Sequence, residues 1–209
     1  MSRPDADILE RARAGDRDAI GALLEPELDR VYATCRRMVG NADDAAELAQ
    51  DSVVRAIRGI GSYDGRSAFS TWLTRVTINT CLSWHRARGR RSAIRAASLR
   101  DAGSFPDASV SGRPGTEPER TDGVQRGEPR VARVEAALDQ LNPEHRAVLV
   151  LRDVREMDYE AIGAALDLPL GTVKSRISRA RGALRRLLEA EEADESHGHE
   201  RGDGSAMES

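Results

Sequence analysis

The sequence of 209 residues has little of two features that mark common protein classes, cysteine and long apolar runs. Its two cysteines, Cys35 and Cys81, stand far apart in the chain, with no CxxC pair and no histidine at ligand spacing. This pattern excludes a disulfide framework and a zinc site. We interpret both residues as small buried hydrophobic side chains.

Apolar runs are short throughout. The longest is AVLVL at residues 147–151, and the first thirty residues interleave charged side chains with apolar ones. A spanning helix needs about 20 predominantly apolar residues, and a signal peptide needs an apolar core. We therefore expect no membrane insertion and a cytoplasmic location.

Catalytic signatures are missing as well. The four histidines, His85, His145, His197 and His199, have no paired ligands in the sequence. No Gly-rich phosphate loop follows a strand and no nucleophile motif occurs. The sequence predicts a protein that is not an enzyme and that needs neither a cofactor nor a metal.

Strand-like alternation is also lacking, whereas apolar residues recur at helical spacing of three and four. Residues 101–130 interrupt this pattern with four prolines and five glycines, a composition typical of a linker. We predict an all-α fold of two small helical domains, at residues 1–100 and 131–188, joined by a flexible linker at 101–130. Residues 189–209 would form an acidic, disordered tail.

Positive charge gathers in two segments of a chain whose net charge is −3. Residues 171–188 and residues 85–100 each hold six basic residues and no acid. The tail from Glu189 carries eight acids and one base, so residues 1–188 have a net charge of +4. Two basic segments indicate a polyanion contacted twice, although each alone is also compatible with a solvated helix face.

The C-terminal segment has the pattern of a helix-turn-helix. A helix is expected at 131–141, and a second begins at Pro143 with Asn142 as its N-cap. A third helix at 158–166, a short turn, and a fourth helix from 171 follow. In a helix-turn-helix, the last of these helices enters the DNA major groove.

A helical wheel separates two faces of this last helix. One arc is apolar and would pack on the preceding helices: Val173, Ile177, Ala180, Leu184, Leu187 and Leu188. The opposite arc is polar or basic and could contact bases and phosphates: Lys174, Ser175, Ser178, Arg179 and Gly182, flanked by Arg176 and Arg181. Arg185 and Arg186 lie further along, where backbone contacts or solvent are expected.

Two N-terminal helices also present mixed faces. In the helix from Asp43 to Arg58, an outward Val54 is ringed by polar residues, which suits a docking surface. The predicted buried face of that helix is Ala45, Ala46, Ala49, Val53, Ala56 and Ile57. In the next helix, Phe69, Trp72, Leu73, Val76 and Thr80 would pack inward. Its second stripe could meet phosphates and base edges: Arg75, Asn79, Leu82 and Arg86.

At this point the chain resembles a known family. YEAIGAALDLPLGTVKSRISRARGALRRLL (159–188) resembles the region 4 helix-turn-helix of extracytoplasmic-function sigma factors, the specificity subunits of bacterial RNA polymerase. ADDAAELAQDSVVRAI (42–57) and FSTWLTRVTINTCLSWHRARGRR (69–91) are similar to region 2 of the same family. The resemblance covers about residues 8–91 and 131–188, in the family's order.

The resemblance implies core RNA polymerase and promoter DNA as partners, and it allows for an anti-sigma factor. Polymerase docking, on the clamp helices of the largest subunit, would fall to Glu47, Gln50, Asp51 and Val54. Minus-10 recognition, with a flipped base held by the loop GIGSYDGRSA (59–68), would fall to Ser62, Tyr63, Asp64, Arg75, Asn79 and Arg86. Minus-35 recognition would fall to Thr172, Lys174, Ser175, Arg176, Ser178, Arg179 and Arg181.

Two other functions remain open from the residues alone. A free-standing helix-turn-helix regulator would explain residues 131–188, but not the second basic segment with its Trp72 helix. An enzyme fused to a DNA-binding lobe would need a catalytic site, which the sequence does not contain.

Overall fold

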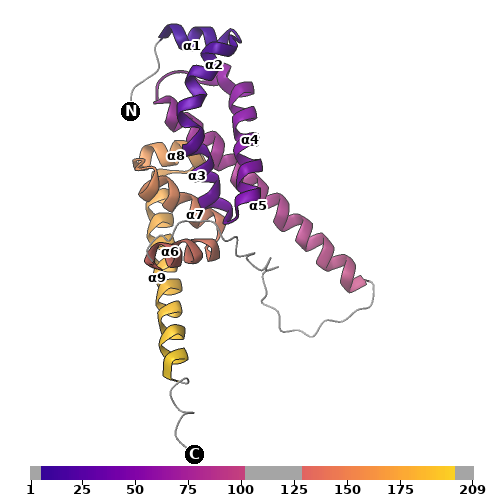
Figure 1. Cartoon of the computed structure of the whole chain (residues 1–209), viewed down its shortest axis with the longest axis vertical. Helices are drawn as coiled ribbons and strands as arrows, with labels where there is room; N and C mark the ends of the chain where they lie inside the picture. The colour runs from indigo at the N-terminus through magenta and orange to yellow at the C-terminus, as the bar shows by residue number, and fades with distance from the viewer. Residues whose placement is uncertain (1–5, 102–128, 201–209) are drawn as a thin grey trace, which may run out of the picture. The chain divides into compact units, whose positions relative to one another are not determined.

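The computed structural model describes residues 6–101 and 129–200, with side chains described for 6–95 and 131–190. Helices make up these ranges, and no strand occurs in them, which confirms the all-α prediction. The chain divides into two compact units, Met1–Gln125 and Arg126–Ser209 (Figure 1). The division falls inside the predicted linker, most of which lies outside the described residues.

The described part of unit 1 contains five α-helices, and local signals account for several of their ends. They are α1 (Ala6–Arg13), α2 (Arg17–Leu24), α3 (Leu28–Val39), α4 (Ala42–Gly59) and α5 (Phe69–Asp101). Asp16 caps α2 by accepting hydrogen bonds from the Asp18 and Ala19 amides, and Asn41 caps α4 through the Asp44 amide. Gly40 ends α3 with φ +83°, a left-handed conformation that glycine adopts without strain.

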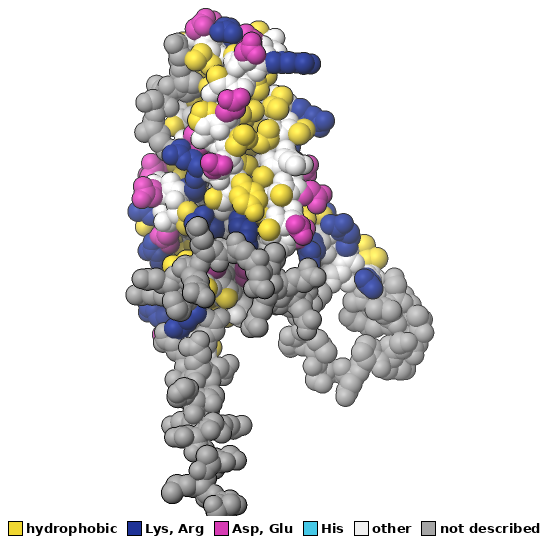
Figure 2. Space-filling model, in the orientation of Figure 1, with side chains coloured by type: hydrophobic (Ala, Val, Ile, Leu, Met, Phe, Trp, Pro, Cys, Tyr) yellow, Lys and Arg dark blue, Asp and Glu magenta, His cyan; other side chains and the backbone are white. Residues whose placement is uncertain are grey.

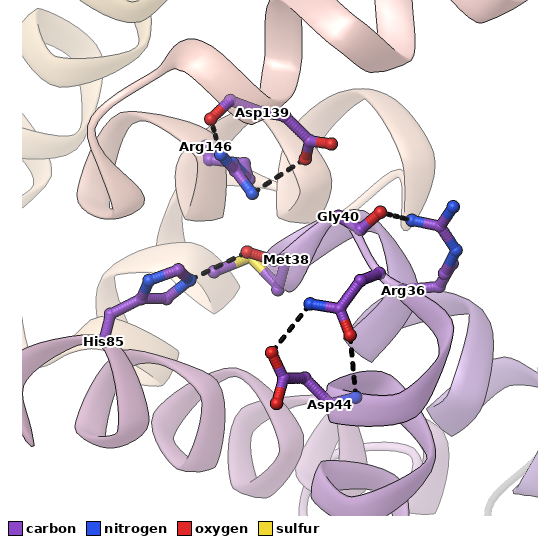
Figure 3. Close-up of polar contacts among 8 residues, drawn as sticks. Arg36, Met38, Gly40, Asp44, His85, Asp139 and Arg146 are labelled. Atoms are coloured by element: carbon purple, nitrogen blue, oxygen red, sulfur yellow. Dashed lines mark hydrogen bonds and ion pairs between the residues drawn. The ribbon is translucent and has the colours of Figure 1, made fainter. Parts of the chain in front are cut away.

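The core of unit 1 lies where α3, α4 and α5 pack against one another. Buried apolar residues from these helices include Val31, Met38, Leu48, Leu73 and Ile78. One residue before the end of α3, the Met38 carbonyl lies 2.8 Å from His85 Nε2 of α5 (Figure 3). This polar contact sets the register between the two helices.

The predicted packing face of α5 is confirmed, and that of α4 needs correction. Phe69, Leu73 and Thr80 are buried, with Trp72 and Val76 half-buried. On α4, however, Ala46 and Ile57 are exposed, while Leu48 and Ser52 are buried. The buried residues of α4 are Ala45, Leu48, Ser52 and Ala56, because α3 and α5 cover that side of the helix. The buried Ser52 hydroxyl donates a hydrogen bond to the Leu48 carbonyl at 2.6 Å.

Unit 2 is organised around one long helix. Its elements are α6 (Pro129–Gln140), α7 (Pro143–Leu149), a π-helical turn (Val150–Val154), α8 (Tyr159–Leu166) and α9 (Leu170–Glu200). Helices α6, α7 and α8 each pack on α9. Asn142 caps α7 as predicted, accepting from the Glu144 amide at 2.9 Å. The buried Arg146 of α7 donates to Asp139 Oδ1 at 3.0 Å and to the Asp139 carbonyl, which ties α7 to α6 (Figure 3).

The turn between α8 and α9 is tight. Asp167 adopts the left-handed conformation with φ +55°, and the Leu168 amide donates to the Gly163 carbonyl at 2.9 Å. A Cβ on Gly163 would lie 2.9 Å from the Leu168 carbonyl oxygen, closer than real Cβ contacts. The helix-turn-helix therefore needs glycine at this position, because the turn crosses directly over it.

Two helices continue past the segments that pack. Arg88–Arg95 of α5 are exposed, so the basic segment projects from unit 1, where Figure 2 shows Lys and Arg side chains standing out. Helix α9 is continuous to Glu200, beyond residue 188, where we expected the tail to begin. Its residues 189–195 are mostly Ala and Glu, which favour helix. The last part of the predicted tail, 201–209, lies outside the described residues. None of the helices in the described ranges is long and apolar enough to cross a membrane.

Candidate nucleic-acid interface

The outward face of α9 matches the predicted arrangement. Lys174, Ser175, Ser178 and Arg179 are exposed, whereas Val173, Ile177 and Ala180 on the opposite side are buried against the rest of unit 2. Thr172 at the start of the helix is half-buried. We call the four exposed residues the recognition face. Its first turns present an ammonium, two hydroxyls and a guanidinium, groups that bind base edges and phosphates.

Within this face, Arg179 is pre-positioned by Ser175. Its Nη2 donates to Ser175 Oγ at 3.0 Å and its Nε to the Ser175 carbonyl at 3.3 Å. Ser175 Oγ in turn donates to the Thr172 carbonyl at 3.1 Å. These contacts lay the exposed guanidinium along the helix toward its N-terminal turns, the part of a recognition helix that reaches base edges. A guanine edge could replace them with two hydrogen bonds.

The two flanking arginines are held differently. Arg176 Nη1 lies 2.8 Å from Glu144 Oε2 at the start of α7, and Arg181 Nη2 lies 2.5 Å from Asp153 Oδ1 in the π-helical turn. The hydrogen bond that Arg181 donates to Asp153 raises the pKa of Arg181 above its ordinary value. Both ion pairs tie α9 to the preceding segment. Arg176 and Arg181 are thus partly engaged in holding the helix.

Sequence reasoning missed a cluster beside Lys174. The Tyr159 ring, at the first residue of α8, has Arg152 Cζ at 5.0 Å and Lys174 Nζ at 5.9 Å from its centroid. Arg152 also donates to the Met157 carbonyl at 2.8 Å. Tyr159 is half-buried. The signal that could have found it is a tyrosine at the first residue of the helix before the recognition helix.

On α5, the predicted polar stripe faces outward. Arg75, Asn79 and Arg86 are exposed and Leu82 is half-buried. Arg86 Nη2 lies 3.4 Å from Ser83 Oγ, a weak contact within the same helix. The stripe therefore offers two guanidinium groups and an amide along one side of α5, and these groups suit phosphates and base edges.

The loop before α5 only partly fits its predicted role. Ser62 and Asp64 are exposed, but Tyr63 is 1% exposed. The Tyr63 ring packs 5.6 Å from that of Phe69 and 5.4 Å from that of Trp72, and its hydroxyl donates to the Ser67 carbonyl at 2.6 Å. Tyr63 belongs to the core of unit 1, because its ring completes the aromatic cluster that anchors the loop. The buried Tyr63 side chain therefore cannot contact DNA in this conformation.

The predicted docking face of α4 is exposed at all four positions: Glu47, Gln50, Asp51 and Val54. The valine is 43% exposed, and Ile57 one turn later is 42% exposed. The helix thus presents two neighbouring apolar side chains among polar ones. In Figure 2, hydrophobic side chains gather between charged ones on the visible face of unit 1. Such a patch fits a protein partner better than DNA.

Metal chemistry finds no support in the ranges that the structure describes. There, no cluster of three or more His, Cys, Asp or Glu side chains could hold a metal ion. The histidines of the His-Gly-His segment, residues 197–199, lie among residues whose side chains are not described.

Comparison with known proteins identifies the same two segments. The family model for Sigma-70 region 2 matches residues 23–91, and the model for Sigma-70, region 4 matches residues 137–186. The RNA polymerase sigma-H factor of Pseudomonas aeruginosa is 34% identical over 185 residues, which cover 88% of this chain and 94% of the relative. The ECF RNA polymerase sigma factor SigW of Bacillus subtilis is 32% identical over 188 residues, with coverages of 86% and 94%.

A solved structure resembles the chain over both units. It is a co-crystal structure of the sigma factor RpoE in complex with the anti-sigma factor NepR from Bartonella quintana. The similarity has a TM-score of 0.57 at 28% identity and covers 79% of this chain and 94% of the other.

Proposed function

The chain belongs to the extracytoplasmic-function (ECF) sigma factors of RNA polymerase, and we propose that it divides promoter recognition between its two helical units. Sigma factors direct RNA polymerase to promoters and are not enzymes. The observation that carries the division is the exposure of Lys174, Ser175 and Arg179 on the second helix of a helix-turn-helix. Each unit brings its own basic helix to the DNA.

In unit 2, the recognition face reads the minus-35 element. Arg179 supplies the bidentate donor that recognises a guanine edge, and Lys174, Ser175 and Ser178 contact neighbouring bases or phosphates. Arg152 and Tyr159 extend this surface beside Lys174. Arg176 and Arg181 hold α9 on its support through their ion pairs, and contact phosphate from the edges of the face.

In unit 1, α5 and the loop before it contact the minus-10 element. Arg75 and Arg86 bind phosphates of the opened strand, and Asn79 lies between them, where an amide can pair with a base edge. Ser62 and Asp64 line the loop in which a flipped base would sit. The buried Tyr63 supports this loop from below, through the bond between its hydroxyl and the Ser67 carbonyl.

The exposed face of α4 docks on core RNA polymerase. Val54 and Ile57 supply apolar contact, and Glu47, Gln50 and Asp51 surround them with polar groups, which suits a specific and reversible interface. The docking partner would be the clamp helices of the largest subunit. This assignment places the protein in the cytoplasm, together with the polymerase.

An anti-sigma factor is a further partner of this family type. The similar Bartonella quintana structure is a sigma factor bound to an anti-sigma factor. We propose that this chain is held inactive by such a protein, which would compete with core polymerase for exposed surface of unit 1.

Run-off transcription tests the proposed function. Purified protein and core polymerase are incubated with genomic fragments, and the start sites are mapped. We expect transcripts that depend on the added protein and share two upstream elements. A pull-down with core polymerase runs in parallel. DNA binding without any association with core polymerase would favour a free-standing regulator and contradict the proposal.

A further inference from the structure

The chain's two cysteines, far apart in the sequence, meet in the core of unit 1. Cys35 of α3 and Cys81 of α5 are free thiols, both 0% exposed, and their sulfur atoms lie 3.8 Å apart. The Cys81 thiol donates a hydrogen bond to Cys35 Sγ. Burial of both residues was expected from the sequence, but their pairing was not. Two thiols at this distance are close enough for an oxidant to join them in a disulfide.

The surroundings shift the pKa values of the two thiols in opposite directions. The hydrogen bond from Cys81 lowers the pKa of the Cys35 thiol against the opposing effect of burial, and the polar Ser52 side chain of α4 also lowers it. The same bond to Cys35, together with burial, raises the pKa of Cys81. Cys35 is therefore the more nucleophilic member, since the thiolate is the reactive form.

The helices that carry the thiols are held in register. One turn further along both helices, the Met38 carbonyl of α3 contacts His85 Nε2 of α5 at 2.8 Å (Figure 3). This contact keeps Cys35 opposite Cys81 when the surrounding side chains move. A disulfide needs an S–S distance of about 2.0 Å, so the two sulfurs must approach each other by roughly 1.8 Å.

We propose that Cys35 and Cys81 form an oxidisable dithiol, which a hydroperoxide converts to a disulfide that joins α3 to α5. The disulfide weakens recognition of the minus-10 element by unit 1. The Cys35 thiol first loses its proton, and its sulfur attacks the terminal OH oxygen of the hydroperoxide to become a sulfenic acid. The O–O bond breaks, and the leaving alkoxide takes up the released proton to become an alcohol. The Cys81 thiol then attacks the Cys35 sulfur, and water leaves. Two thiols and one hydroperoxide thus yield one disulfide, one alcohol and one water.

The functional consequence rests on the proposed function of unit 1. Cys81 lies on α5 between Asn79 and Leu82 of the polar stripe. Ser52, whose side chain affects the pKa of Cys35, is next to Asp51 of the docking face. Drawing the sulfurs together shifts α5 against α3 and α4, beneath both surfaces. Both cysteines of the chain lie in unit 1. Because unit 2 has no cysteine, peroxide should not change its binding to the minus-35 element.

The chemistry is tested on the full chain with hydrogen peroxide as the oxidant. We expect the intact mass to fall by two hydrogens, a non-reducing digest to contain a peptide that links Cys35 to Cys81, and dithiothreitol to reverse both. Because both thiols are buried, oxidation should be slower than that of glutathione in the same tube and faster in dilute urea. Two alkylatable thiols remaining after prolonged exposure to excess peroxide in dilute urea would overturn the proposal.

Matched variants identify the attacking sulfur. In Cys81→Ala, peroxide should leave a sulfenic acid on Cys35 that dimedone traps, whereas Cys35→Ala should give little trapped product. Circular dichroism checks that both variants keep their helices. Trapping that occurs mainly on Cys81 would contradict the order of the two steps, and the wild-type mass measurement stays decisive if either variant unfolds.

Transcription then tests the effect on function. Oxidised protein is freed of peroxide and mixed with reduced core polymerase, and we expect a several-fold loss of run-off product that dithiothreitol restores. Binding to a minus-35 duplex, followed by fluorescence anisotropy, should be unchanged. If reduced protein drives no transcription, the proposed function itself fails. If the reduced and disulfide forms transcribe equally well, the regulatory inference alone is overturned.

Discussion

The two basic helices of this sigma factor hold their charges in different ways. On α9, Arg176 and Arg181 pair with acids of the preceding segment at 2.8 and 2.5 Å, and Arg179 bonds Ser175 of its own helix. On α5, Arg88 lies 3.8 Å from Asp44, and the described arginines beyond it are exposed on a part of the helix that projects from its unit. A basic run in a sequence therefore mixes charges that support the fold with charges available to DNA.

The units also differ in what accompanies the basic helix. Unit 1 adds an exposed apolar pair, Val54 and Ile57, on a second helix. In unit 2, three other helices pack against the basic helix α9. The turn that joins α8 to α9 lies close against Gly163. On the proposed function, unit 1 combines a protein-docking face with a DNA-contacting helix, whereas unit 2 packs three helices against a single DNA-contacting helix.

The largest expected effect comes from breaking the docking face of unit 1. Val54→Glu should lower affinity for core polymerase by about 2 kcal/mol or more, because a charge replaces an apolar contact at the centre of the patch. The measurement is a pull-down or anisotropy titration with core polymerase. Val154→Glu is the matched control, a valine of unit 2 that is 41% exposed, and it should bind normally. Loss of helicity in Val54→Glu would mean that the residue supports the fold.

Removing Arg179, to which we assign base reading in unit 2, should have the next largest effect. Arg179→Ala should cost ~1–3 kcal/mol on the preferred minus-35 sequence and relax discrimination there. Arg185→Ala, more than a turn later, should weaken all sequences alike and reduce the salt dependence by about one unit. Binding to single-base variants of the element at two salt concentrations separates the two. An equal loss on every variant for Arg179→Ala would assign it to phosphate.

A pair of glycine substitutions tests how tightly unit 2 is built. Gly163→Ala should lower the free energy of unfolding by ~1–3 kcal/mol, because the new methyl meets the Leu168 carbonyl. Gly182→Ala of α9 meets only Arg186 Nη1, at 3.9 Å, and should raise stability by ~0.5–1 kcal/mol through helix propensity. Denaturant unfolding measures both. Equal effects at the two positions would show that the turn can relax.

The smallest expected effect distinguishes Arg176, which we expect to stabilise the fold, from Arg179, which we expect to contact bases. Arg176→Ala should reduce stability by about 0.5–1 kcal/mol through loss of its partly exposed ion pair with Glu144, and Arg179→Ala should not. Glu144→Gln should lower stability to a similar extent while leaving minus-35 discrimination intact. Salt should weaken the difference, because such pairs are screened. A stability loss in Arg179→Ala as large as that in Arg176→Ala would remove the distinction between the two arginines.

Much of the candidate site was predictable because it lies on single helices. The spacing of Val173, Ile177 and Ala180 set the buried side of α9, and the recognition face followed on the other side. The same reasoning correctly placed the outward stripe of α5. It misassigned Ala46, Leu48 and Ile57 of α4, because alanine-rich helices have weakly defined apolar sides and the neighbouring helices decide which side is covered.

The sequence by itself determined the family, the all-helical fold and local helix signals such as the cap at Asn142, because each depends on residues within a few positions of one another. Tertiary structure alone decided that Tyr63 is core and that Arg176 and Arg181 meet Glu144 and Asp153. It also brought Cys35 to Cys81. These contacts join residues from different helices or loops, and local periodicity carries no information about which side chains packing will bring together.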